Sequence, residues 1–95
     1  MNNYTLKDFK IVKDVDPRIA FGIESKDSNI SCNFFWTKGN VELRGLIFND
    51  SSKLIHIAYP FANKDGFTEM PYNIKECIIE SLVKRLKEME VYKNE

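Results

Sequence analysis

Apolar and polar residues alternate with a period of two along much of the first two thirds of the chain. The clearest segments are 19–23 and 30–36, where every second residue is apolar and a polar turn at 26–29 joins the two. Such alternation is typical of β-strands that bury one face. We predict strands at about 4–12, 19–25, 30–37, 41–48 and 53–59.

The period changes to steps of three and four residues in the last quarter of the chain. The apolar positions at this spacing are Ile74, Cys77, Ile78, Leu82, Leu86 and Met89. They predict an amphipathic helix over about 73–91, with Asn73 as N-cap and Glu76 as the capping-box carboxylate.

The short turns between the predicted strands determine how the strands pair. Parallel pairing needs long crossovers, so these strands must form an antiparallel meander. The sequence therefore predicts a single α+β domain over residues 1–95, in which four or five short antiparallel strands are followed by one C-terminal helix.

Three apolar strand residues are out of phase with the expected core. Phe35, Leu46 and Phe48 have the opposite parity to neighbours such as Phe34 and Ile47. One helix covers one face of a sheet, so these residues indicate either a second covered surface or side chains that lie under a loop. We predict that Phe35, Leu46 and Phe48 form an interface, with a second copy in a homodimer or with a different protein target.

The charged residues balance. Fourteen basic and fourteen acidic side chains leave no net charge, so attraction to phosphate or to anionic lipid has no global source. A local basic patch is still expected on the helix and the loop before it. The predicted contacts with DNA or RNA are Lys64, Lys75, Lys84, Arg85 and Lys87. The alternative is a solvated helix face whose late cations favour the helix dipole.

Side chains suited to catalysis are few and scattered. His56 lies in the middle of a strand, where a hydrogen-bonded histidine is a simpler interpretation than catalysis with Cys32 or Cys77. The two cysteines match no zinc-binding spacing and are expected to be small buried side chains in a reducing compartment. The sequence contains no nucleotide-binding or metalloprotease motif. We expect a protein that is not an enzyme and that needs no metal or cofactor.

The composition indicates where such a protein acts. Hydrophobic residues make up 43% of the chain, which is enough for one core. The apolar runs are too short to cross a membrane, and the N-terminal residues show no signal-peptide pattern. We therefore expect a cytoplasmic protein. The abundance of Lys, Asn and Ile is what A/T-rich codons produce, as in some bacteria and their phages.

The second half of the chain has a recognisable order of elements. The strand Arg44-Gly45-Leu46-Ile47-Phe48 is followed by a strand that ends on Pro60, then by Asp65-Gly66-Phe67, Pro71 and the helix. Over residues 41–90 this order resembles the SpoVG family, small bacterial regulators named after stage V sporulation protein G. The resemblance implies a dimeric, cytoplasmic protein of one sheet and one helix that binds DNA or RNA and affects gene expression. The alternative function is a small protein-interaction module, such as a phage-encoded inhibitor of a host system.

Overall fold

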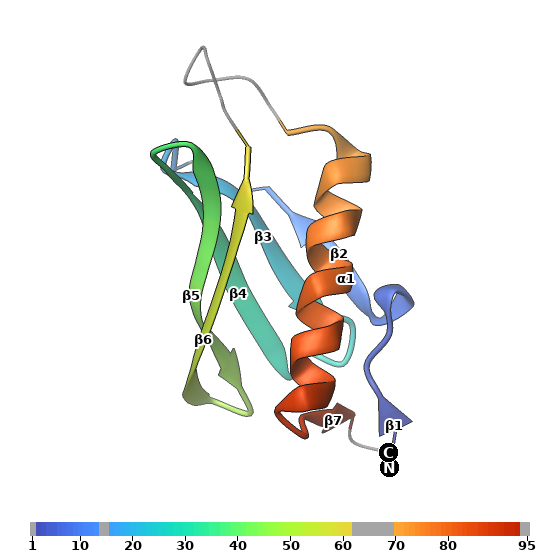
Figure 1. Ribbon diagram of the computed structural model, residues 1–95. Coiled ribbons are helices and arrows are strands. Elements are labelled where there is room, and N and C mark those ends of the chain that lie inside the picture. The colour runs from blue at the N-terminus through green and yellow to red at the C-terminus, as the bar shows by residue number, and fades with distance from the viewer. Residues whose placement is uncertain (1, 14–15, 62–69, 94–95) are drawn as a thin grey trace.

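The computed structural model describes residues 2–13, 16–61 and 70–93 and has one main sheet and one α-helix (Figure 1). Helix α1 (Tyr72–Glu88) packs on one face of a five-stranded antiparallel sheet in the order β2-β3-β4-β5-β6. The strands are β2 (Phe9–Val12), β3 (Ile19–Ser25), β4 (Ile30–Thr37), β5 (Asn40–Phe48) and β6 (Ser51–Pro60). The predicted α+β meander is confirmed.

A second sheet joins the two ends of the chain. Strand β1 (Asn2–Asn3) pairs antiparallel with β7 (Tyr92–Lys93), next to the last turn of α1 in Figure 1. Lys93 Nζ also lies 2.9 Å from the Asp8 carboxylate. The sequence did not predict this sheet, because two-residue strands show no period.

The predicted strand over 4–12 is correct only for its second half. Residues Leu6–Asp8 form a short 3-10 helix, η1. The Asp8 carboxylate accepts hydrogen bonds from the N–H and the hydroxyl of Thr5 at 2.7 and 3.0 Å. This local pairing stabilises a helical turn in place of the extended chain.

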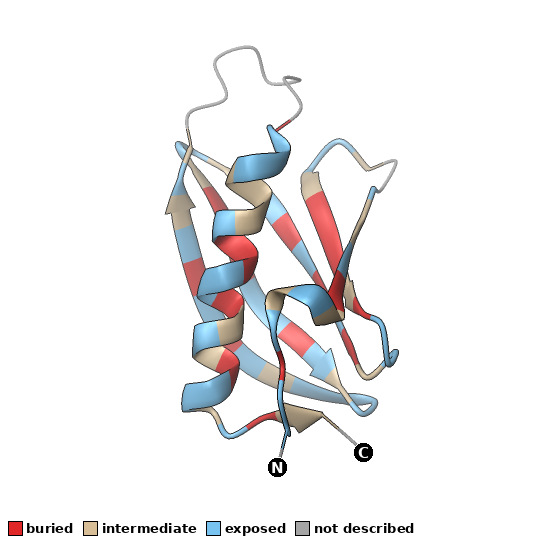
Figure 2. Ribbon diagram, turned by 90° about the vertical axis from the view of Figure 1, so that its right-hand side faces the viewer, coloured by how far each residue is buried: buried red, intermediate tan, exposed pale blue. Residues whose placement is uncertain are grey.

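The core lies between α1 and the inner face of the sheet. The helix buries Ile78, Ile79, Leu82 and Leu86, which form the red stripe facing the strands in Figure 2. On the sheet, the rings of Phe21 and Phe34 stack with centroids 4.9 Å apart. Within the described residues, no helix is long and apolar enough to cross a bilayer.

One of the two cysteines is not where it was predicted to be. Cys32 is buried, as expected, but Cys77 is exposed on α1. Cys77 lies at the border of the apolar stripe, and the helix is rotated so that Ile79 is buried on the other side of that stripe. The helical spacing of the apolar residues is as predicted, but the buried face is centred further towards Ile79 than the sequence indicated.

Both ends of α1 differ from the prediction. The Pro71 carbonyl accepts the first hydrogen bonds of the helix, at 3.1 and 3.2 Å, so Asn73 lies inside the first turn and the N-cap has no side-chain hydrogen bond. The helix ends at Glu88 rather than near 91. Glu90 adopts a left-handed φ of 58°, which reverses the chain and returns Val91 to the core.

The pairing of β5 shifts in the middle of the strand. Its register with β6 changes between Leu43 and Gly45, and its register with β4 changes over the same stretch. As a result, Arg44 and Gly45 are consecutive exposed residues. Beyond them Leu46 faces the core with 2% exposure, and Ile47 faces outwards with 48% exposure.

This shift removes Leu46 from the predicted interface of Phe35, Leu46 and Phe48 and leaves Phe48 only partly exposed. Leu46 is buried, and Phe48 is half-buried against the core. Phe35 remains exposed, at 40%. Strict alternation placed Leu46 outside and Ile47 inside, and a one-residue register shift exchanges these two faces.

Candidate functional site

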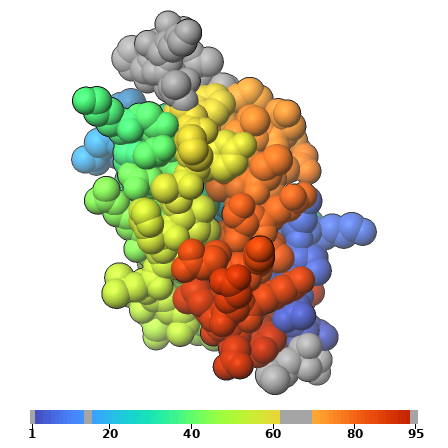
Figure 3. Space-filling view, in the orientation of Figure 1, coloured from blue at the N-terminus to red at the C-terminus, as the bar shows by residue number. Residues whose placement is uncertain are grey.

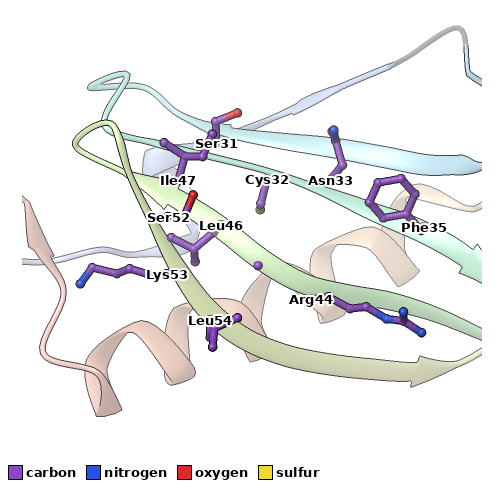
Figure 4. Close-up of a pocket in the computed structure, with 11 residues that line it drawn as sticks. Ser31, Cys32, Asn33, Phe35, Arg44, Leu46, Ile47, Ser52, Lys53 and Leu54 are labelled. Atoms are coloured by element: carbon purple, nitrogen blue, oxygen red, sulfur yellow. The ribbon is translucent and has the colours of Figure 1, made fainter.

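The outer face of the sheet, opposite α1, carries an open hollow of about 360 Å³ (Figure 4). It lies over β4, β5 and β6, and we call it the outer hollow. Its lining consists of residues 31–33, 35, 44–47 and 52–54.

Three exposed apolar side chains line the outer hollow, one from each of these strands. They are Phe35 on β4, Ile47 on β5 and Leu54 on β6, and Leu54 is 93% exposed. Single exposed apolar residues are ordinary, but a group that faces one depression is typical of an interaction site. Sequence reasoning found Phe35 and missed the other two.

Part of the lining of the outer hollow is bare backbone, at Gly45. This residue lies opposite Leu54 in the pairing of β5 with β6. A Cβ added to Gly45 would lie 3.5 Å from the carbonyl oxygen of Lys53, an ordinary contact, so space alone does not demand glycine here. Glycine inside a strand typically marks a bulge or a close approach by another molecule, and here it coincides with the register shift.

A small polar cluster lies beside the outer hollow on the same face. His56 Nε2 is 3.0 Å from Glu42 Oε1, and Arg44 Nη2 is 3.6 Å from Glu42 Oε2. Hydrogen bonds from Thr37 and then from His56 lower the pKa of Glu42, so it remains ionised near neutral pH. The expectation of a hydrogen-bonded strand histidine is confirmed.

Two cations line the outer hollow, and they point in different directions. Figure 4 shows Arg44 at the end that carries Phe35, whereas the Lys53 side chain extends away at the opposite end. Lys53 Nζ lies 5.9 Å from the ring centroid of Phe48, a cation–π contact. Arg44 is therefore the cation that remains directed along the outer face.

The predicted nucleic-acid contacts differ in their exposure and in their partners. Lys64 lies outside the described residues. Lys75 is half-buried, with Nζ 5.8 Å from the ring centroid of Phe21. Lys84 and Lys87 are exposed, and within the described part of the chain neither has an ion-pair partner.

Arg85, the fifth predicted contact, joins the helix to the sheet. Its Nη1 donates a hydrogen bond of 2.9 Å to the carbonyl oxygen of His56, and its Nε lies 3.6 Å from Glu88 Oε2. Figure 3 shows the surface of α1 directly against that of β6. Arg85 is thus held by protein groups and is less available to phosphate than its two lysine neighbours.

Two features of the described residues bear on metal and thiol chemistry. Across 2–13, 16–61 and 70–93, no three His, Cys, Asp or Glu side chains are grouped so that they could hold a metal ion. Burial raises the pKa of the Cys32 thiol to about 12, which makes it a poor nucleophile.

Comparison with known proteins identifies no relative. No protein-family model, no curated protein and no solved structure matches this chain. The resemblance to the SpoVG family over residues 41–90 therefore stays a prediction from the sequence.

Proposed function

We propose that this chain is a non-enzymatic protein-interaction module that binds a protein target through the outer face of its sheet. The observation that carries the proposal is the group of Phe35, Ile47 and Leu54 around the outer hollow. Ser31, Asn33 and Ser52 add hydrogen-bonding groups between them. An apolar centre with polar surroundings is the usual anatomy of a protein–protein interface.

The types of apolar residue favour a protein over a nucleic acid at this face. Single-stranded nucleic acids are held by stacking of bases on aromatic rings. Of the exposed apolar residues at the outer hollow, Phe35 alone is aromatic. The aliphatic side chains of Ile47 and Leu54 offer no stacking surface but pack well against apolar side chains of a protein.

The test uses a random peptide library displayed on phage and selected on the immobilised protein. We expect the selected peptides to bind the Gly45→Val variant at least about tenfold more weakly, because the new side chain adds bulk to a backbone segment that lines the outer hollow. The backbone at Gly45 is not left-handed, and a Cβ fits there, so the variant should fold.

Ala58→Val is the matched control for this experiment. Ala58 is exposed on β6, has the same parity as Leu54, and does not line the outer hollow. The Ala58→Val variant should bind the selected peptides with the same affinity as the wild type. Peptides that bind the wild type and Gly45→Val equally well would remove the proposed docking surface.

Nucleic-acid binding through α1 is the second candidate function. It is favoured by the exposure of Lys84 and Lys87, three residues apart on one helix and without ion-pair partners among the described residues. The affinity for labelled DNA and RNA can be measured by fluorescence anisotropy over a range of salt concentrations. Replacing both lysines by glutamate should weaken binding strongly and reduce the salt slope by about two, since about one counterion is released per phosphate contact.

The control for that double variant carries the same charge change elsewhere. Lys26 and Lys38 are exposed in the turns between strands, and replacing both by glutamate should leave the salt slope nearly unchanged. A wild type with no measurable affinity at low salt discards the nucleic-acid candidate.

A further inference from the structure

Every charged side chain that lines the outer hollow is a cation. The lining contains Arg44 and Lys53, and none of its described residues is Asp or Glu. Lys53 Nζ lies over the ring of Phe48, and its side chain extends away from the outer hollow in Figure 4, so Arg44 is the lining cation on which we focus. Its side chain is 76% exposed.

Arg44 keeps most of its hydrogen-bonding capacity. Its ion pair among the described residues is the 3.6 Å approach to Glu42, which is longer than a hydrogen bond. Glu42 is itself engaged by His56 at 3.0 Å and by Thr37. A guanidinium carries five N–H donors in a planar fork that matches a carboxylate.

We propose that the outer hollow receives a segment of the protein target in which a large apolar side chain stands beside a carboxylate. This inference rests on the proposed function and names the partner chemistry for the same site. The apolar side chain packs among Phe35, Ile47 and Leu54. The carboxylate binds the guanidinium of Arg44, where a bidentate, charge-assisted contact adds geometric specificity.

A second copy of the chain fits the outer hollow less well than such a target. A twofold interface brings the same surface patch of both subunits together. Two patches centred on the outer hollow would bring the cations of both linings together, and the nearby carboxylate of Glu42 is already engaged by His56 at 3.0 Å. An acidic residue of a different target protein would instead be attracted to the guanidinium of Arg44.

The test repeats the peptide selection on the wild type and on Arg44→Glu in parallel. We expect wild-type selections to enrich Asp or Glu within a few positions of Phe, Leu, Ile or Trp. The Arg44→Glu selections should enrich Lys or Arg instead, and wild-type peptides should bind this variant at least about tenfold more weakly. Arg44→Gln, which places no second carboxylate beside Glu42, should lose the acidic preference and gain no basic one.

Lys84→Glu is the matched control, because it makes the same charge change on the exposed side of α1. It should retain the wild-type preference. Peptides without acidic enrichment that still lose affinity for Gly45→Val would overturn this inference and leave the proposed function standing. Peptides insensitive to Gly45→Val would overturn both. A dimer in light scattering that Gly45→Val dissociates would show that a second copy occupies the outer hollow, and would also overturn the inference.

Discussion

Replacing Leu82 by alanine should lower the free energy of unfolding by about 2–4 kcal/mol. Leu82 is fully buried near the middle of α1, where it belongs to the stripe that faces the sheet. The substitution removes apolar contact and leaves a cavity that a packed core only partly closes. Urea denaturation followed by circular dichroism measures the change.

Ser81→Ala is the control, since it makes an adjacent residue of the same helix alanine. Ser81 is exposed and bonds to the carbonyl oxygen of Cys77 at 3.3 Å. Its replacement should change stability by less than about 0.5 kcal/mol. A similarly small change for Leu82→Ala would mean that the apolar stripe does not face the sheet.

Replacing Asp27 by alanine should lower the free energy of unfolding by about 1–3 kcal/mol. The substitution leaves the buried hydroxyl of Tyr4 without its acceptor. Asp27 lies in the turn between β3 and β4 and accepts hydrogen bonds from three directions. The donors are the Tyr4 hydroxyl at 2.8 Å, the Ser25 hydroxyl at 2.6 Å and the Asn29 N–H at 3.1 Å. Tyr4→Phe removes one of these bonds and should cost less.

The effect of Asp27 should depend on pH. Partial burial alone would raise the pKa of Asp27, but the hydrogen bonds from Ser25, from the Asn29 backbone and from Tyr4 together lower it. A folded pKa below the unfolded value of about 3.9 gives stability that is present above that value and lost as pH falls through the folded pKa. The stability gap between wild type and Asp27→Ala should therefore narrow at acidic pH. A gap that stays constant down to about pH 3 would show that the ionised carboxylate contributes nothing.

The fold could be predicted because its clearest elements follow regular periods. Alternation over 30–37 and helical spacing over 74–86 each have one buried face, and the structure places those faces together. The short turns then permit little besides an antiparallel meander. The two-residue strands β1 and β7 have no period, so nothing in the sequence pattern indicated them.

The docking surface was only partly predictable, because alternation fails where a strand changes register. The shift near Gly45 moved Leu46 inwards and Ile47 outwards. Gly45 itself was the available signal, since glycine inside a strand is typical of a bulge. Leu54 could also have been found, because Ile55 and Ile57 define the buried parity of β6 and leave Leu54 on the other face.

The hydrogen bond from Arg85 to the His56 carbonyl also bears on aggregation. Strand β6 is an edge of the main sheet, and the backbone groups of an edge strand can pair with strands of other molecules. Arg85, near the C-terminal end of α1, binds one of these carbonyls and so helps to cover that edge. Fraying of the helix end, a low-energy local opening in most proteins, would then expose a strand edge at the same time. We therefore expect the tendency of this protein to aggregate to follow the stability of the C-terminal end of α1 more closely than its global stability.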